Sequence, residues 1–172
     1  IASIESWNTH ETPVMARAGQ SVGITLDEQV FVERGEVASH INDPPIETDV
    51  FHLRLFWLAD TALEIGKTYN LKIGPRHLSA VVERIERVID VEALSDHAAT
   101  QVSRDEIAEV VVRTNQLVAI DIHDNLPRTG RVIVYDRHRT LAGGIVSMGS
   151  YPDQREQITI RASNLTEVDH GV

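Results

Sequence analysis

The chain contains no cysteine, which excludes disulfide bonds and thiolate metal sites. No apolar run approaches the ~18 residues of a membrane-spanning helix. The first ten residues lack the basic region and the apolar core of a secretory signal. These absences predict a cytoplasmic protein in a reducing compartment. The sequence also begins without methionine, so we expect it to be a piece of a longer protein.

Positive charge is scarce as well. The 172 residues include 26 acidic and 16 basic side chains, which gives a formal net charge of −10. A general binder of nucleic acid neutralises phosphates with a broad basic surface, so this charge argues against that class of function. One local basic patch is still compatible with one acidic partner. The 42% hydrophobic and 24% charged content is that of a globular domain with a real core.

Most of the chain has the pattern of β-strands. Segments rich in Val, Ile, Leu and aromatic residues alternate with clusters of Gly, Pro, Asn and Asp. Many short strands separated by frequent turns predict a barrel or a sandwich. The predicted strands cover residues 21–26, 50–58, 69–73, 77–91, 109–122 and 131–136.

Some segments are ambiguous. Residues 81–90 also fit one helical face, but we interpret them as a strand because their Val and Ile side chains are β-branched. Residues 103–110 fit a turn or a short helical loop, with Ser103 as its cap and Glu106 three positions later. Two prolines interrupt the pattern at residues 40–49 and suggest a domain boundary. Residues 151–172 are interpreted as a terminal strand followed by a linker.

Three short motifs resemble sites, and each has a simpler explanation. Gly66-Lys67-Thr68 matches the end of a phosphate-binding P-loop, but Thr61 stands where its first glycine is required, so we interpret it as a hairpin turn. Asp121 and His123, with Asp124 next to them, are potential metal ligands, but without a distant partner we favour a solvated strand end before a turn. A nucleophile elbow of the form G-x-S-x-G is absent. We therefore predict no catalytic, cofactor-binding or metal-binding residue in this chain.

Residues 128–140, here called the basic segment, stand out. They contain four arginines, Arg128, Arg131, Arg137 and Arg139, and one acidic residue, Asp136. Alternation along a strand at 131–136 predicts Val132 and Val134 on one face and Arg131 on the other. Arg128 and Arg131 then flank the turn before the strand, and Arg137 and Arg139 lie in the loop after it. Two explanations remain open: ion pairs within this acidic chain, or recognition of carboxylate or phosphate on a partner.

Several stretches together resemble one family. The sequence ARAGQSVGITLDEQVFVERGEV at 16–37 resembles the closing strands of the second domain of translational GTPases such as elongation factor Tu. The sequence DNLPRTGRVIVYDRHRTLAGGIVS at 124–147 resembles late strands of the third domain. Trp57 at the end of a strand and the run LEIGKTYNLKI at 63–73 are similar to one branch of that superfamily. This branch is the large, GTP-hydrolysing subunit of bacterial sulfate adenylyltransferase, which is often fused to adenylylsulfate kinase.

The resemblance implies an all-β fold, namely an antiparallel six-stranded β-barrel of the elongation-factor domain III type, preceded by strands of a partial second barrel. Residues 1–42 would be the end of the domain II barrel, 43–150 the domain III barrel, and 151–172 the terminal strand and linker. The GTPase motifs of the family are absent from this chain. The chain alone is therefore expected to be catalytically inactive and to bind no cofactor, with GTP and magnesium belonging to a missing GTPase domain and ATP to a partner subunit.

The implied function is that of a coupling region. It would link the GTPase domain of the same protein to the small catalytic subunit of sulfate adenylyltransferase, without membrane or nucleic acid. The four arginines would be a docking surface either for the small subunit or for the GTPase domain. Two alternatives remain: the barrels of another translation-type GTPase that binds tRNA, and a free-standing β-barrel binding module.

Overall fold

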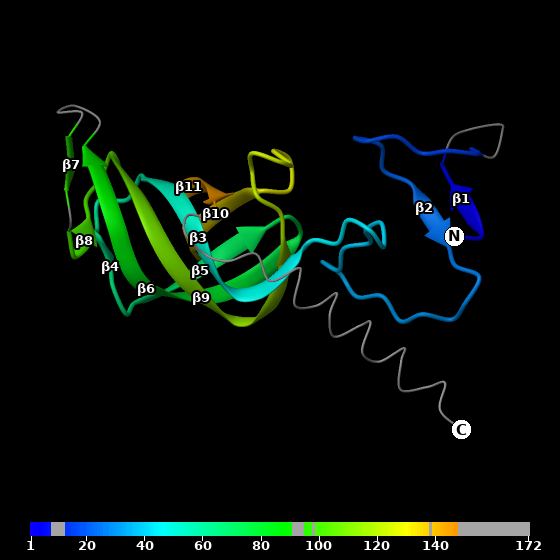
Figure 1. Ribbon diagram of the computed structural model, residues 1–172, viewed down its shortest axis with the longest axis horizontal. Helices are drawn as coiled ribbons and strands as arrows, with labels where there is room; N and C mark the ends of the chain where they lie inside the picture. Colours follow the sequence, from blue (N-terminus) through cyan, green and yellow to red (C-terminus); the bar gives the residue numbers. More distant parts are fainter. Residues whose placement is uncertain (8–12, 91–94, 98, 138, 148–172) are drawn as a thin grey trace, which may run out of the picture. The chain divides into compact units, whose positions relative to one another are not determined.

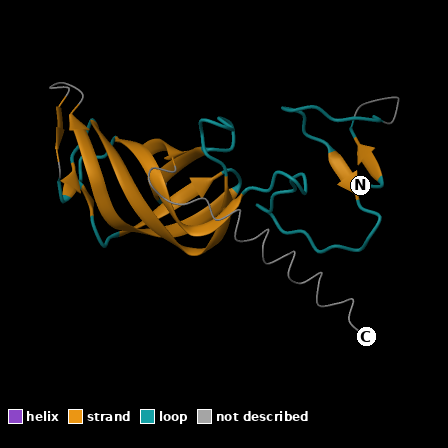
Figure 2. Ribbon diagram, in the orientation of Figure 1, coloured by secondary structure: helices purple, strands orange, loops and turns teal. Residues whose placement is uncertain are grey.

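The computed structural model describes residues 1–7, 13–90, 95–97, 99–137 and 139–147. The chain divides into two compact units, Ile1–Glu33 and a second unit that begins at Arg34. The described residues form strands and loops (Figure 2). Among them, no helix has the length and apolar character needed to cross a membrane. The proposed limits of the domains at residues 42 and 150 stay a prediction.

The first unit contains one short two-stranded ribbon. Strand β1 (Ser3–Glu5) pairs antiparallel with β2 (Gly23–Thr25), so that Ile4 lies opposite Ile24. The hydroxyl groups of Ser3 and Thr25 share a hydrogen bond of 2.6 Å across the ribbon. The assignment of residues 1–42 to the end of a second barrel stays a prediction, and β1 and β2 are the strands that the structure describes within this range.

The second unit is built on a closed antiparallel barrel of six strands (Figure 1). Each strand pairs with the next in the order β5, β10, β11, β3, β9, β6, and β6 pairs with β5 to complete the ring. The predicted six-stranded barrel is confirmed. The barrel strands are β3 (Ile46–Trp57), β5 (Thr68–Ile73), β6 (Arg76–Asp90), β9 (Glu106–Ile120), β10 (Arg131–Asp136) and β11 (Arg139–Ser147).

Three short strands complete the secondary structure. Strand β4 (Leu63–Glu64) pairs with β8 (Gln101–Val102), and β7 (Ser95–His97) pairs with the end of β6. The sequence pattern did not predict these strands, because two or three residues are too few to show a period.

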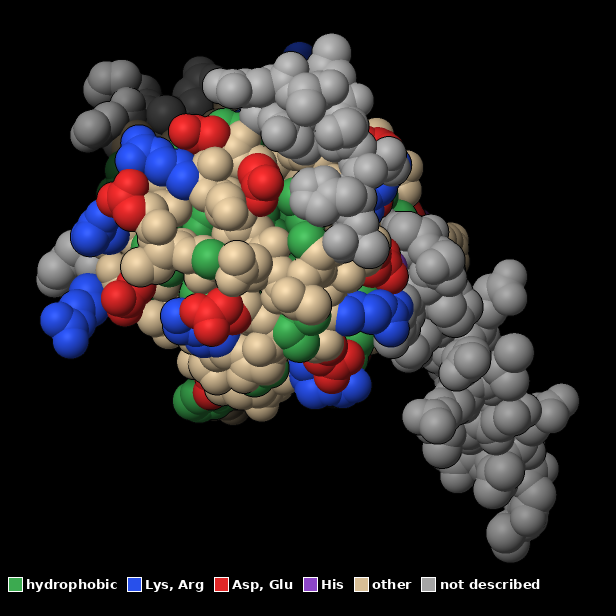
Figure 3. Space-filling view, turned by 90° about the vertical axis from the view of Figure 1, so that its left-hand side faces the viewer, with side chains coloured by type: hydrophobic (Ala, Val, Ile, Leu, Met, Phe, Trp, Pro, Cys, Tyr) green, Lys and Arg blue, Asp and Glu red, His purple; other side chains and the backbone are tan. Residues whose placement is uncertain are grey.

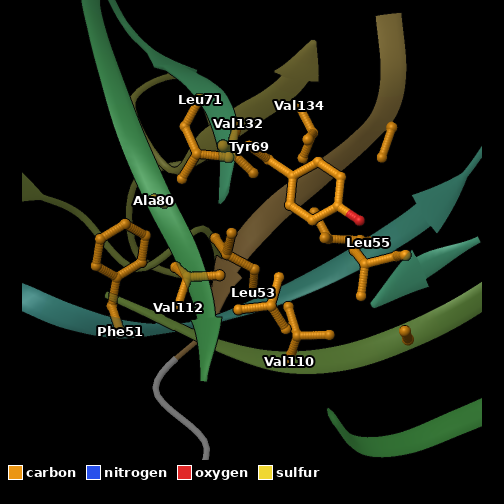
Figure 4. Packing of buried hydrophobic residues seen from close by; sticks show 14 of the residues in the cluster. Phe51, Leu53, Leu55, Tyr69, Leu71, Ala80, Val110, Val112, Val132 and Val134 are labelled. Atoms are coloured by element: carbon orange, nitrogen blue, oxygen red, sulfur yellow. The ribbon is translucent and has the colours of Figure 1, made fainter. Parts of the chain in front are cut away.

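The barrel interior is filled by alternate side chains of the six strands, as the period of a half-buried strand requires. On β10, Val132 and Val134 are 2% and 1% exposed, whereas Arg131 points outward. Figure 4 shows the inward side chains of several strands meeting in one cluster. The labelled residues are Phe51, Leu53, Leu55, Tyr69, Leu71, Ala80, Val110, Val112, Val132 and Val134.

Trp57 anchors one end of this core. It is the last residue of β3, as expected, and it is fully buried. Its indole Nε1 donates a hydrogen bond of 2.7 Å to the carbonyl of Thr61, which satisfies the one polar atom of the ring. The ring of Tyr69 meets it edge to face, with centroids 5.7 Å apart. This packing fixes the loop that follows β3.

The Gly66-Lys67-Thr68 motif forms a turn between β4 and β5 and not a P-loop. Gly66 has a φ of +80°, a conformation that suits glycine, and its N–H donates to the carbonyl of Val82. Strand β5 starts directly at Thr68, where a P-loop would need the N-terminus of a helix. A turn is therefore confirmed, but the expected hairpin is wrong, because β4 pairs with β8 and β5 pairs with β6 and β10.

The structure also settles the ambiguous segments. Residues 81–90 belong to β6, so the strand interpretation is confirmed. Of the two interpretations of residues 103–110, the turn is right and the helical loop is wrong, because Asp105 adopts a φ of 66° and β9 begins at Glu106. The Glu106 carboxylate accepts the Ser103 N–H at 2.6 Å and stabilises that turn. The predicted strand at 151–172 lies outside the described residues.

Candidate partner-docking surface

The four arginines of the basic segment lie on β10, on the turns at its two ends and at the start of β11. Arg128 belongs to the turn that precedes β10, Arg131 is the first residue of the strand, and Arg137 follows it with a φ of 50°. All four side chains are exposed. We expected Arg139 in a loop, and this is wrong: it starts β11 and lies opposite Asp136 in the hairpin.

The arginines form two pairs and not a single cluster. Strand residues rise by ~3.3 Å, so about 20 Å of strand separate Arg131 from Arg137. Arg128 and Arg131 lie at one end of β10, and Arg137 and Arg139 lie at the other. The two pairs still fit within one protein interface of ordinary size, whose ~800 Å² per partner extends over a comparable length.

A tight turn positions the pair formed by Arg128 and Arg131. The N–H of Gly130 donates to the carbonyl of Leu126 at 3.0 Å, and its own carbonyl accepts the N–H of Val146 at 2.8 Å. A Cβ at position 130 would lie 2.5 Å from the Cα of His123, so only glycine fits there. The backbone contacts of this glycine therefore fix where the turn enters β10.

The loop between β9 and β10, which includes this turn, also contains the candidate metal ligands. Strand β9 ends at Ile120, so Asp121 and His123 follow the strand and do not share one of its faces. His123 Nδ1 lies 3.7 Å from Asp124 Oδ1. The part of the chain that the structure describes contains no group of three or more potential ligands placed to hold a metal ion.

The four arginines make no ion pair and no side-chain hydrogen bond with any described residue. Even Asp136, whose backbone lies opposite Arg139 in the hairpin, forms no side-chain ion pair with it. Lys72 on β5 resembles them, since it is exposed and without an ion pair within the described residues. Internal ion pairing, the first of the two explanations, therefore finds no support in the geometry.

Arginines on the opposite strands of the barrel behave differently. Glu109 on β9 accepts a hydrogen bond from Arg54 Nη2 on β3 at 2.8 Å and from Arg87 Nη2 on β6 at 2.9 Å. Burial raises the pKa of Glu109, but the hydrogen bonds from Arg87 and Arg54 outweigh burial and bring the pKa below its usual value. One carboxylate thus joins three adjacent strands.

Two further carboxylates on these strands bind Arg113. This side chain on β9 bonds to Glu83 on β6 and, at 2.9 Å, to Asp49 on β3. The hydrogen bond to Glu83, against a smaller desolvation, raises the pKa of the Arg113 guanidinium. We call the six residues of these two groups the arginine–carboxylate network: Asp49, Arg54, Glu83, Arg87, Glu109 and Arg113.

Ion pairs also occur where β4 and β8 lie. Arg104 Nη1 is 2.6 Å from Asp60 Oδ1, and Lys67 Nζ is 3.1 Å from Glu64 Oε1. Figure 3 looks onto this end of the molecule, where basic and acidic side chains lie next to one another. These cations differ from the four arginines of the basic segment in having carboxylate partners. They do not differ in exposure, since all of them reach solvent.

A hollow of about 370 Å³ adjoins the pair formed by Arg137 and Arg139. Its lining mixes both signs of charge with aromatic rings and includes Asp60, Lys67, Tyr69, Asp136 and Arg139. Because the acidic and basic groups offset each other, the hollow offers no net charge that would select an anion.

Comparison with known proteins identifies the barrel. Residues 50–147 match the protein-family model described as GTP-eEF1A C-terminal domain-like. The chain belongs to this family. The match starts within β3 and ends at the last residue of β11, so it covers nearly all of the GTP-eEF1A C-terminal domain-like barrel described above.

Relatives with similar sequences include subunit 1 of sulfate adenylyltransferase and bifunctional enzymes. Sulfate adenylyltransferase subunit 1 of Laribacter hongkongensis is 30% identical over 139 residues, which is 79% of this chain and 29% of the relative. The bifunctional enzyme NodQ of Azospirillum brasilense is 32% identical over 76% of this chain and 22% of its own length. The chain thus spans less than a third of the curated relatives that it matches.

A solved structure supports the fold independently. The crystal structure of Sup35 complexed with GDP superposes with a TM-score of 0.57 at 14% identity, over 63% of this chain and 27% of Sup35. At this identity the likeness concerns the fold alone.

Sequence reasoning missed one part of this surface. It singled out the four arginines but not Lys72, whose position opposite Ile133 on β10 places it on the same outer face. The alternation in the segment 68–73 shows that Lys72 points outward, but only the pairing of β5 with β10 shows which side chains it neighbours.

Proposed function

We propose that this chain is the non-catalytic barrel region of the large subunit of a GTP-dependent sulfate adenylyltransferase. In this role the barrel docks the small catalytic subunit that makes adenylylsulfate and connects it to the GTPase domain of the parent protein. The resemblance to sulfate adenylyltransferase subunit 1 supports this choice, since a numbered subunit implies another. GTP, magnesium and ATP act outside this region.

The observation that carries the proposal is the unpaired state of the four arginines among the described residues. On the other strands of the barrel, Arg54, Arg84, Arg87 and Arg113 bond to carboxylates, and Arg76 donates to the carbonyl of Leu117. A chain with 26 acidic residues has many carboxylates available, yet none of those described pairs with the basic segment. Exposed guanidinium groups are suited to bidentate contact with carboxylates of another surface.

Charge complementarity of this kind steers association and selects the partner. The six-stranded barrel has every strand paired on both sides, so it can move as one body when a GTPase domain changes its state. Docking on β10 would then transmit that movement to the partner subunit.

The test is a binding measurement with the full-length large subunit. Arg128, Arg131, Arg137 and Arg139 are replaced by Ala, and the dissociation constant for the small subunit is measured at ~50 and ~300 mM salt, because screening weakens exposed charge contacts. We expect binding to weaken at least ~10-fold at the lower salt concentration.

The matched control removes four cations that are paired in this structure, namely Lys67, Arg84, Arg104 and Arg113. It changes the net charge equally and should leave the affinity within about threefold. If the four-arginine variant and the wild type bind the small subunit with equal affinity, the proposal is wrong. Salt-sensitive binding of tRNA in place of the small subunit would move the chain to translation.

A further inference from the structure

The outer face of the barrel carries a row of four adjacent residues from four strands. Lys72 on β5 lies opposite Ile133 on β10, Ile133 lies opposite Gly143 on β11, and Gly143 lies opposite Phe56 on β3. Residues paired in this way project to the same side of a sheet. We call these residues, Lys72, Ile133, Gly143 and Phe56, the open row.

The centre of the open row is hollowed by the missing side chain of Gly143. A Cβ built at this position would meet no other atom within 4 Å. The flanking side chains stand up as walls, since Ile133 is 43% exposed and Phe56 is 38% exposed. Neighbouring strands lie ~4.8 Å apart, so the two walls are about 10 Å apart, which leaves room for one inserted side chain.

Cations border this apolar groove. Lys72 ends the row, and Arg131 lies on the same outer face of β10, two positions before Ile133. Neither makes an ion pair with a described residue, whereas Arg54, two positions before Phe56, is held by Glu109. The unpaired charge is therefore confined to the side of the row formed by β5 and β10.

We propose that the open row receives one apolar side chain of the small catalytic subunit, set among carboxylates that contact Arg131 and Lys72. The inference rests on the function proposed above and names the centre of that contact. An apolar anchor in a pocket with a charged rim is the usual arrangement of a protein interface. A second copy of this chain fits poorly, because a symmetric contact would place Arg131 and Lys72 against themselves.

Gly143→Gln fills the groove without touching any charge. Gly143 has no positive φ, and its Cβ position is free, so the fold should accept the new side chain and the melting temperature should be unchanged or higher. In the full-length large subunit we expect the dissociation constant for the small subunit to rise ~10-fold, measured by titration calorimetry. The change should persist at ~300 mM salt, because it is steric.

Ile133→Glu is the second variant, and Ile65→Glu is its matched control. Ile65 is 44% exposed in the turn after β4, so both variants introduce the same negative charge at similar exposure. We expect Ile133→Glu to weaken binding ~30-fold or more and Ile65→Glu to leave it within about twofold.

The outcomes separate the two proposals. Loss of binding in the four-arginine variant with normal binding of Gly143→Gln and Ile133→Glu would overturn the open row and keep the docking function. Failure of the wild-type large subunit to bind the small subunit would overturn both. If Ile133→Glu instead loosens the large subunit towards proteolysis while binding stays normal, the open row faces another domain of the same chain, and the inference is wrong.

Discussion

The two sides of the barrel use arginine in different ways. On β3, β9 and β6, Arg54, Arg87 and Arg113 bond to carboxylates on neighbouring strands. On β10, its flanking turns and the start of β11, four exposed arginines bond to no described side chain. The residue type is the same, and the cross-strand neighbour makes the difference: Arg131 lies opposite Ile145, whereas Arg54 lies opposite Glu109. Composition alone therefore says little about what an arginine does.

The contrast has an energetic side. Exposed ion pairs contribute ~0–1 kcal/mol each, but a carboxylate shared by two guanidinium groups and partly buried contributes more. Unpaired exposed arginines remain hydrated and contribute almost nothing to folding. The network side should therefore respond to mutation in stability, and the basic segment in binding.

The largest effect on stability is expected at two adjacent glycines of β11, the strand that lies between β10 and β3. A Cβ at Gly144 would lie 2.4 Å from the carbonyl oxygen of Arg54, whereas one at Gly143 would meet nothing. Gly144→Ala should lower the free energy of unfolding by about 2–4 kcal/mol, because the rigid barrel cannot relax. Gly143→Ala is the control and should change it by less than ~0.5 kcal/mol. Urea unfolding measures both, and equal losses would contradict the packing described here.

Removal of the shared carboxylate comes next. Glu109→Gln leaves Arg54 and Arg87 without their common ionised acceptor and should destabilise the chain by about 1 kcal/mol. Asp136→Asn, on the side of the basic segment, is the matched control and should have no measurable effect. If both substitutions lower the free energy of unfolding equally, the Glu109 carboxylate stabilises the fold no more than a solvated carboxylate does.

The stability difference between the wild type and Glu109→Gln should depend on pH. The pKa of Glu109 is lowered in the folded chain, so the ionised carboxylate stabilises the fold above its unfolded pKa of ~4.3. This contribution is lost as the pH falls through the lower folded value. The advantage of the wild type over Glu109→Gln should thus be constant near neutral pH and disappear in acid, as urea unfolding between about pH 3 and 7 would show. An advantage that persisted in acid would indicate packing in place of charge.

The smallest expected effect is on the four arginines. Arg131→Ala and Arg139→Ala should each change the free energy of unfolding by less than ~0.5 kcal/mol, because neither side chain has a partner among the described residues. Arg87→Ala, which removes one donor to Glu109, serves as the comparison and should cost more. Differential scanning calorimetry of the three variants decides this, and a large loss for Arg131→Ala would assign the basic segment to folding.

Strict alternation made most of the barrel predictable. The segment 131–136 matches β10 at both ends, and Val and Ile at alternate positions identify its inner face. Strand β11 was absent from the predicted strands, because Gly143 and Gly144 dilute its apolar pattern. Strand β3 begins at Ile46, four residues before its predicted start, because the two prolines and the polar residues at 40–49 were interpreted as a boundary.

The functional surfaces were less predictable. The basic segment stood out in the sequence because its arginines are close together along the chain. The arginine–carboxylate network did not, since Arg54 and Glu109 are 55 residues apart and only strand register brings them together. The open row has the same cause: its four members come from four strands. Local sequence shows which way a side chain points, and pairing decides which side chains it meets.

Closure of the barrel has a mechanical consequence. Every long strand is bonded along both edges, from β5 through β10, β11, β3 and β9 to β6 and back. No strand can slide without breaking ladders on two sides, and no strand of a partner can extend the ring. A force applied at one end of the barrel is therefore transmitted to the other end with little deformation. Substitution of outward-facing side chains should leave that stiffness unchanged.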